Sequence, residues 1–244
     1  MNPQWSLIQA PTATLNDIRT ITLDLDDTLW EIHPVIRRAE QALYEWLGQN
    51  YPRITELHQP EDMRLVRSQV VAEHADQAHD LTFLRRTVLR RVGKAAGYGT
   101  DFIDDAFAVF DAVRNDVELF PEVLPALESL RDRYTLIAVT NGNANLGTIG
   151  IEHLFHDTVT AAKAGAAKPA RAVFDMAVAA GGAGHKQTLH VGDHPEYDVN
   201  GARAAGLRTV WVNRKSESWP DTLPMPDIEV LHIGELVSHL GDIR

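Results

Sequence analysis

The amino-acid sequence predicts an α/β protein, a doubly wound parallel sheet with an inserted all-helical cap domain. Three observations support this fold class. Short apolar runs without polar alternation recur along the chain, helical patterns separate the later runs, and one long stretch after the first run carries helical patterns only. Unbroken apolar runs are typical of strands that are buried on both faces, and alternating strands and helices are typical of parallel sheets covered by helices.

The expected strands are five short segments rich in Val, Ile, Leu and Thr, at 20–25, 135–140, 158–161, 188–191 and 208–212. Helical patterns with one apolar side lie between the later strands, at 121–133, 169–180 and 195–205. Gly206 follows the last of these patterns, and glycine often ends a helix because it adopts the left-handed conformation without strain. Strand and helix are therefore expected to alternate from the middle of the chain onward.

The stretch between the first strand and residue 117 contains no convincing strand pattern and is expected to form the cap. Pro34 opens a helical pattern that is followed by Gly48, and Pro60 opens a second pattern. Asp80 and Thr100 are candidate N-caps of two further helices, because their side chains accept hydrogen bonds from free N–H groups. We predict that residues 1–30 and 118–244 form an α/β core that carries the catalytic site, and that residues 31–117 form a helical cap.

The composition is that of an ordinary globular protein, with 244 residues of which 44% are hydrophobic and 23% are charged. The net charge of −11 argues against binding to nucleic acid or to an anionic membrane, and it requires local positive charge for any anionic substrate. The absence of cysteine excludes disulfides, thiolate metal sites and cysteine-based phosphatase chemistry. Residues 1–17 lack the features of a secretion signal, and no apolar run is long enough to span a bilayer, so a cytoplasmic location is expected.

Two carboxylates end the first predicted strand. Asp24 and Asp26 stand two residues apart, directly after the run 21–23. An ionised carboxylate at the end of a buried strand is costly unless it is paired or binds a metal. Ligands of open parallel sheets bind at the carboxyl ends of the strands. We therefore interpret Asp24 as a nucleophile that attacks a phosphate and Asp26 as the group that transfers the proton.

Further polar segments occupy comparable positions later in the chain. These candidate site residues follow predicted strands or open predicted helices: Thr140, Asn141, Lys168, Asp193 and Asp198. Because strand ends and helix starts meet at one edge of a parallel sheet, all of them can converge on one crevice. Lys163 is the alternative to Lys168, which is preferred because it precedes a proline at a helix entrance.

Charge balance predicts a magnesium ion in this crevice. A phosphate monoester carries a charge of about −2, and Asp24, Asp193 and Asp198 add three negative charges. Mg²⁺ and the Lys168 ammonium return three positive charges, and Mg²⁺ prefers oxygen ligands. Asp24, Asp193 and the main-chain carbonyl of Asp26 are the expected ligands, and Asp198 is expected to orient the waters around the ion.

The predicted reaction has two steps. Asp24 attacks phosphorus and forms an aspartyl-phosphate. Asp26 donates a proton to the leaving alkoxide and then accepts a proton from the water that hydrolyses the intermediate. Thr140, Asn141 and nearby main-chain N–H groups are expected at the non-bridging oxygens, where Lys168 neutralises the developing charge.

The order of these segments resembles the four motifs of the haloacid dehalogenase-like hydrolase superfamily. The resemblance is carried by Asp24, Asp26, Thr140, Lys168 and Asp193, with Asp198 as the trailing acid. The helical stretch after the first motif is similar to the small α-helical cap of this superfamily. The acid at position 26 resembles the phosphatases, since the dehalogenases proper lack it. The resemblance implies a Mg²⁺-dependent phosphatase that acts on a small phosphorylated metabolite.

A narrower resemblance is to the YigB-like bacterial branch, and it is carried by the segments 140–143, 189–193 and 219–236. Members of this branch are linked to dephosphorylation of 5-amino-6-(5-phospho-D-ribitylamino)uracil in riboflavin biosynthesis, and of flavin mononucleotide (FMN). His194 stands where relatives often carry Ser or Asp, so the resemblance assigns it no role. Two other classes stay open, a phosphotransferase such as a sugar-phosphate mutase and a catalytically silent binding protein of the same fold.

Several side chains near the first motif and in the cap have both a structural and a functional interpretation. Core packing is favoured for Trp30, helix capping for His33, and a solvated face for Arg37 and Arg38, although each could contact a substrate. The third cap helix carries four arginines that are expected to form a wet basic face rather than a ligand site: Arg85, Arg86, Arg90 and Arg91.

Overall fold

A six-stranded parallel sheet lies at the centre of the α/β core in the computed structural model, which describes residues 15–241. The strands are Thr20–Leu23 (β1), Thr135–Thr140 (β2), Asp157–Thr160 (β3), Thr188–Gly192 (β4), Arg208–Val212 (β5) and Ile228–Val230 (β6). Their order in the sheet is β3-β2-β1-β4-β5-β6, and each neighbouring pair is parallel. The chain therefore builds outward from β1 in both directions, as expected for a doubly wound sheet.

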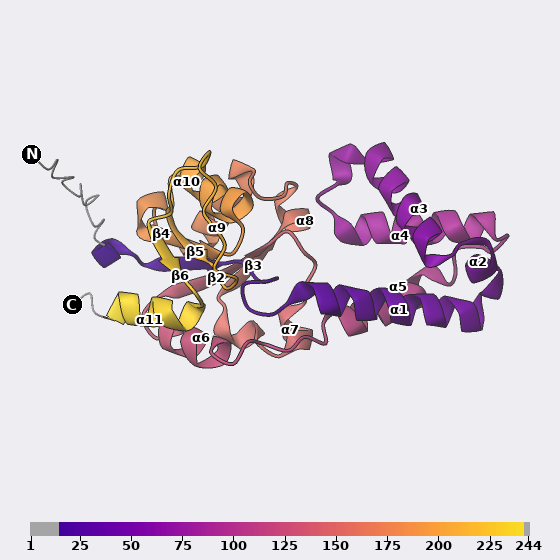
Figure 1. The fold of residues 1–244 in the computed structure, drawn as a ribbon, viewed down its shortest axis with the longest axis horizontal. Coiled ribbons are helices and arrows are strands. Elements are labelled where there is room, and N and C mark those ends of the chain that lie inside the picture. Colours follow the sequence, from indigo (N-terminus) through magenta and orange to yellow (C-terminus); the bar gives the residue numbers. More distant parts are fainter. Residues whose placement is uncertain (1–14, 242–244) are drawn as a thin grey trace, which may run out of the picture.

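Helices cover both faces of the sheet (Figure 1). The helices of the core are Val123–Arg131 (α6), Leu146–Ile149 (α7), Ala161–Ala164 (α8), Arg171–Gly181 (α9), Gly201–Ala205 (α10) and Ile233–Gly241 (α11). In β2, Leu136 and Ala138 pack in the hydrophobic cluster that includes α6 and α11, whereas Ile137 and Val139 pack in the cluster that includes α9. Alternate residues of one strand thus serve two apolar layers, because successive side chains of a strand point to opposite faces.

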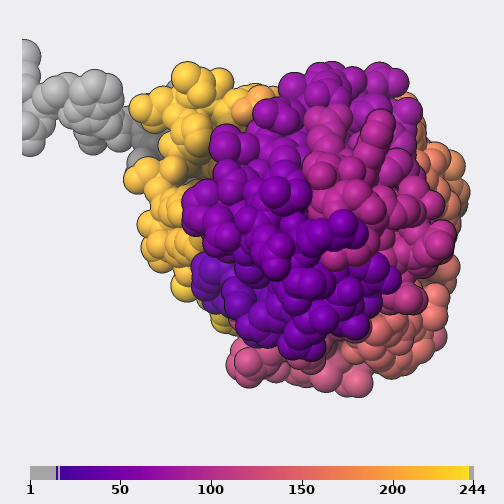
Figure 2. Space-filling view, turned by 90° about the vertical axis from the view of Figure 1, so that its right-hand side faces the viewer, coloured from indigo at the N-terminus to yellow at the C-terminus, as the bar shows by residue number. Residues whose placement is uncertain are grey.

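The inserted cap consists of helices that lie to one side of the sheet (Figure 1), and it forms most of the face of the molecule seen in Figure 2. They are Ile32–Asn50 (α1), Pro52–Leu57 (α2), Pro60–Glu73 (α3), Leu81–Ala95 (α4) and Ile103–Arg114 (α5). Leu47, Val92 and Phe110 belong to a hydrophobic cluster of the cap that is separate from the cluster of the sheet. The α/β core with an inserted helical cap confirms the predicted fold class, and the predicted domain boundaries stay a prediction.

Short turns of other helical types complete the described chain. They are the 3-10 turns Leu15–Asp17 (η1), Ala75–Gln77 (η2), Glu152–Leu154 (η3) and His185–Gln187 (η4), and the π-helical turn Pro195–Asn200 (η5). Most of the N-terminal segment 1–17, which was considered for a secretion signal, lies outside the described residues, as do residues 242–244. Within residues 15–241, no helix is long and apolar enough to cross a membrane.

Three predicted details of the cap are wrong. His33 does not cap a helix, because α1 begins at Ile32 and its N-cap position is Glu31. Helix α1 continues past Gly48 to Asn50, because it is Pro52 that disfavours the helical conformation at the residue before it. Thr100 is not the N-cap of α5, since this helix begins at Ile103 and the N-cap position is Phe102. Asp80, in contrast, caps α4 as predicted, because its carboxylate accepts a hydrogen bond from the Phe83 N–H at 2.8 Å.

Four helices and one strand have no counterpart in the sequence prediction, namely α2, α7, α8, α11 and β6. Strand β6 has only three residues, too few for a recognisable pattern, and its position depends on pairing with β5. The predicted helix at 195–205 is present as the π-helical turn η5 followed by α10, and Gly206 ends it in the left-handed conformation. The sequence thus predicts the central strands better than the edge of the sheet.

The left-handed conformation of Gly206 at the end of α10 can be tested by substitution. Gly206 has a φ of 95°, and a Cβ there would meet only ordinary contacts. We expect Gly206→Ala to lower the free energy of unfolding by about 1 to 2 kcal/mol, through backbone strain alone. Gly99→Ala is the matched control, because Gly99 has no positive φ and open space around it. Urea unfolding measures both variants, and equal stability of the two would contradict the account.

Candidate active site

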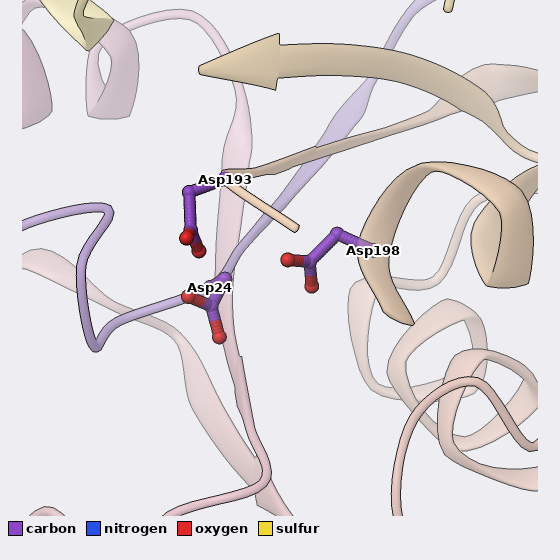
Figure 3. Close-up of side chains that lie close together, drawn as sticks. All are labelled: Asp24, Asp193 and Asp198. Carbon is purple, nitrogen blue, oxygen red and sulfur yellow. The ribbon is translucent and has the colours of Figure 1, made fainter. Parts of the chain in front are cut away.

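Three carboxylates meet at the carboxyl edge of the sheet (Figure 3). Asp24 follows β1 and Asp193 follows β4, and these strands are neighbours. The Asp24 N–H donates to the Val191 carbonyl at 2.9 Å, which extends the pairing of the two strands. Asp198 lies on the turn η5 after β4, and one oxygen atom of each carboxylate lies within 4.8 Å of the others. The structure therefore brings Asp24 together with two residues that lie far from it in the sequence.

Lys168 lies at the centre of this acid cluster. Its Nζ donates to Asp24 Oδ1 at 2.5 Å, to Asp198 Oδ1 at 2.6 Å and to the Val139 carbonyl at 3.1 Å. The side chain is buried, so all three of its donors are used inside the protein. Lys163 is half-exposed and pairs with Asp157 at 3.0 Å, away from this cluster. Of the two candidate lysines, only Lys168 contacts the predicted nucleophile.

Thr140, the last residue of β2, and Asn141, which follows it, shape the site from the other side. Asn141 accepts a hydrogen bond from the Lys168 N–H at 2.7 Å and donates to the Lys168 carbonyl at 3.0 Å, so it fixes the lysine main chain. The buried Thr140 hydroxyl accepts a hydrogen bond from the Gly142 N–H at 2.8 Å. The predicted contacts of Thr140 and Asn141 with a phosphate stay predictions.

The loop after β1 turns within a few residues. Asp27 has a φ of 63°, a conformation that Asp tolerates better than most residues. Its carboxylate accepts a hydrogen bond from the Ile32 N–H at 3.0 Å, at the start of α1. The Thr28 hydroxyl donates to Asp24 Oδ2 at 3.1 Å. Asp24 is therefore held by Lys168 on one oxygen and by Thr28 on the other.

Asp198 is fixed by several polar contacts and by a close approach of the main chain. His190 Nε2 lies 3.1 Å from Asp198 Oδ1, and the His194 N–H donates to Asp198 Oδ2 at 3.0 Å. A Cβ at Gly192 would lie 2.3 Å from Asp198 Cγ, so this carboxylate can occupy its position only beside a glycine. The Nδ1 of His194 accepts hydrogen bonds at the start of η5, and this histidine stacks on Tyr197. His194 therefore has a structural role in this turn.

The electrostatics of the cluster differ from one carboxyl to the next. Burial raises the pKa of Asp24 well above its usual value; Lys168 opposes this shift, and Asp198 and Asp193 add to it. Burial, together with Asp198 and Asp27, raises the pKa of Asp193 to about 7. Although burial acts in the opposite direction, Lys168 and His190 lower the pKa of Asp198. Asp198 is thus the carboxylate that is stabilised in its charged form by Lys168. For Asp24 and Asp193, nearby positive charge does not offset the cost of burying a charged carboxylate.

Arg114, which sequence reasoning missed, holds Asp26. It lies at the end of α5 and is 1% exposed, and its Nη2 is 2.9 Å from both carboxylate oxygens of Asp26. Trp30 is fully buried, which confirms its predicted packing role, and its Nε1 donates to Asp26 Oδ1 at 2.9 Å. Arg114 continues the buried stripe of α5 four residues after Phe110, and an arginine on an apolar stripe was the available signal.

The cluster suits a hard divalent cation. Within residues 15–241, Asp24, Asp193 and Asp198 form a group whose carboxylates can share one ion. Three carboxylates face one lysine, which leaves negative charge inside the protein that a cation would neutralise. All of the donors are oxygens, the ligand type that Mg²⁺ prefers. The residues present therefore fit the magnesium ion that the sequence predicts.

Comparison with known proteins agrees with the family resemblance of the sequence motifs. A family model described as haloacid dehalogenase-like hydrolase matches residues 18–206. The chain is 28% identical to the 5-amino-6-(5-phospho-D-ribitylamino)uracil phosphatase YigB of Escherichia coli, over 92% of this chain and 97% of that protein. It is also 28% identical to a glyceraldehyde 3-phosphate phosphatase of Methanopyrus kandleri, over 93% of this chain and 98% of that protein.

A solved structure shares both the core and the cap. The crystal structure of a 2-haloacid dehalogenase from Pseudomonas syringae pv. Tomato DC3000 aligns with a TM-score of 0.87 and 36% sequence identity, over 92% of this chain and 98% of that chain. The matched family model covers most of the chain, including the first predicted motif and the last. This chain therefore belongs to the haloacid dehalogenase-like hydrolase family.

Proposed function

We propose that this protein is a Mg²⁺-dependent phosphomonoesterase that forms a phosphorylated intermediate on Asp24. The observation that carries this proposal is the buried contact of Lys168 with Asp24 and Asp198 beside Asp193. A carboxylate at the end of a central strand, held in one orientation, is suited to attack phosphorus. A lysine in contact with it can neutralise charge that develops on the phosphoryl oxygens.

In this proposal Asp24, Asp193 and the main-chain carbonyl of Asp26 would hold the magnesium ion, and Asp198 would orient the water molecules around the ion. When bound, the ion neutralises charge on the phosphate and on the acid cluster. Lys168 and Thr28 keep Asp24 in one rotamer through contacts of 2.5 Å and 3.1 Å. The acids are thus organised before the substrate arrives.

Asp26 acts as acid and then as base. In its protonated form it donates a proton to the alkoxide that leaves when Asp24 attacks; the resulting carboxylate later takes a proton from the water that hydrolyses the aspartyl-phosphate and is protonated again. Arg114 and Trp30 orient its carboxylate at the junction of core and cap. Thr140, which is buried beside Asp26, would contribute its hydroxyl to phosphate binding.

For the substrate, we propose a small phosphorylated metabolite in the cytoplasm, with 5-amino-6-(5-phospho-D-ribitylamino)uracil or FMN as the first candidates. The similarity to the E. coli phosphatase over nearly the full length of both chains supports this choice. A riboflavin-pathway reaction would follow from either substrate.

Dehalogenation of a 2-haloacid is the second candidate, because the similar P. syringae structure is described as a 2-haloacid dehalogenase. Asp26 argues against it. A halide leaves as a stable anion and requires no proton, whereas an alkoxide requires one, and an acid at position 26 serves only the second case. A phosphotransferase would share the first step, and transfer of the phosphoryl group to a sugar acceptor instead of water would identify it.

Replacement of the proposed nucleophile is the first test. We expect Asp24→Asn to lower Mg²⁺-dependent hydrolysis of p-nitrophenyl phosphate by at least about a thousandfold, because an amide cannot form the intermediate. Asp157→Asn, which changes a partly exposed carboxylate paired with Lys163, is the matched control and should retain wild-type turnover. The wild type should release no chloride from 2-chloropropionate. Wild-type turnover in Asp24→Asn would refute the assignment.

The raised pKa of Asp193, about 7, generates a second test. Its value in an unfolded chain is about 3.9. Between these two pKa values Asp193 is protonated in the folded protein and ionised in the unfolded chain. The contribution of protonated Asp193 to the stability of the fold is therefore complete below about pH 4 and is lost as the pH rises through about 7. A cation that replaces the proton should therefore stabilise the protein more at high pH.

We expect Mg²⁺ to raise the Tm of the wild type more at about pH 8 than at about pH 5.5. In Asp193→Asn the Mg²⁺-induced shift should be strongly reduced at both pH values, because a ligand is lost and no proton competes at this position. Thermal unfolding with and without Mg²⁺ measures both proteins. An equal Mg²⁺ shift in the two proteins would show that Asp193 is not a ligand.

A further inference from the structure

A cavity of about 580 Å³ lies inside the cap and reaches the candidate active site. Its walls come from α1, α3, α4 and α5, and at its inner end it is lined by Asp26, Gly142 and Arg114. We call it the cap chamber, and its apolar wall includes Ile36, Leu43, Met63, Leu84, Val88 and Phe110. A group attached to a phosphate at Asp24 would thus extend past Asp26 into a largely apolar space.

Helix α4 presents one unexpected residue to this chamber. Leu81, Leu84, Arg85, Val88 and Leu89 all line it, at the spacing of one helix face. Arg85 therefore occupies the centre of an apolar stripe, where a charged side chain is costly unless it has partners. The expected wet basic face on α4 is wrong for this arginine, whose side chain is only 17% exposed.

Arg85 has weak partners for a guanidinium in this position. Its Cζ lies 3.4 Å from the centroid of the Phe110 ring, which supports one face of the group. The nearest carboxylate oxygen, Glu40 Oε1, is 3.7 Å from its Nη2, and the same oxygen is 3.3 Å from Arg67. Within the described part of the chain, Arg85 donates no hydrogen bond of ordinary length. Its contact with Glu40 is long and shared with Arg67, so N–H donors of Arg85 are left for a ligand in the chamber.

The charge and size of the chamber indicate the kind of ligand. Five arginines line it against two carboxylates, Asp26 and Glu40, in a protein whose net charge is −11. Burial lowers the pKa of Arg85 to about 10, so this group is still charged at neutral pH. A cavity of 580 Å³ is within the range of sites for ring-sized ligands, and a three-carbon group would leave most of it to water.

We propose that the cap chamber binds a ring-bearing leaving group of the phosphoester, and that Arg85 recognises a carbonyl or carboxylate oxygen on that ring. This inference rests on the proposed phosphatase function and defines its substrate class. The apolar walls pack against the ring, and the guanidinium supplies directional hydrogen bonds at the end remote from the phosphate. Arg85 is then a specificity-determining residue, and it takes no part in the transfer of the phosphoryl group.

The adjacent arginine provides a matched control. Arg86 also lies on α4, its Cζ is 5.5 Å from the centroid of the Phe107 ring, and it pairs with the exposed Asp104. It does not line the chamber. Arg85→Met and Arg86→Met therefore remove the same charge from neighbouring positions, and only the first changes the proposed subsite. Thermal unfolding of both variants checks that they fold.

The test compares two groups of substrates with Mg²⁺ present. FMN and uridine 5′-monophosphate carry rings with carbonyl groups, whereas glycerol 3-phosphate and glyceraldehyde 3-phosphate carry three-carbon leaving groups. We expect the wild type to show a higher kcat/KM for at least one ring-bearing ester than for both small esters. In Arg85→Met the ratio of kcat/KM for that ring-bearing ester to kcat/KM for a small ester should fall by about tenfold or more, mainly because the KM for the ring-bearing ester rises. Arg86→Met should keep the wild-type ratio.

Each alternative outcome identifies what has failed. If small esters are hydrolysed as well as ring-bearing ones, or if Arg85→Met and Arg86→Met have the same ratio, the chamber inference is wrong and the phosphatase proposal stands. If no ester is hydrolysed in a Mg²⁺-dependent manner, the proposed function itself is wrong. A folded Arg85→Met protein with an unchanged KM for the ring-bearing ester would also overturn the role of Arg85.

Discussion

The contact of the Lys168 ammonium with Asp24 and Asp198 is the interaction on which the rest of the site depends. A buried ammonium between two buried carboxylates is stable only when its donors and their acceptors are all matched, because each charge has lost its water. The Val139 carbonyl takes the third donor, and Asn141 fixes the main chain of the lysine. The lysine thus links the ends of β1 and β2 to the turn η5 and sets the orientation of Asp24.

A second contact joins the cap to this edge of the sheet. Arg114 comes from the end of α5 and pairs with Asp26, which follows β1. The cap therefore reaches the core at the residue to which we assign the proton transfer, and the same arginine lines the cap chamber. In this arrangement one buried arginine connects the selection of a leaving group with the position of the acid that protonates it.

The sequence predicts the site residues of the core well and those of the cap poorly, for a physical reason. Asp24, Thr140, Lys168 and Asp193 stand at strand ends or helix starts, and in a parallel sheet these positions converge whatever the details of packing. Arg114 and Asp26 are 88 residues apart, and their contact depends on how a helix of the cap lies against a loop of the core. Arg85 was expected on a wet face because four arginines on one helix usually are solvated, although its place on the apolar stripe of α4 pointed inward. An isolated charge on an apolar stripe is the signal that would have identified both arginines.

The most direct measurement of the central claim is chemical identification of the phosphorylated residue. Enzyme mixed with substrate and Mg²⁺ is quenched and treated with borohydride, which reduces an acyl phosphate to the alcohol, and the 20–37 peptide is sequenced by mass spectrometry. We expect reduction at position 24 in the wild type and none in protein that was not exposed to substrate. Reduction at Asp26 in place of Asp24, or at a carboxylate outside this peptide, would contradict the assignment of Asp24 as the nucleophile held by Lys168.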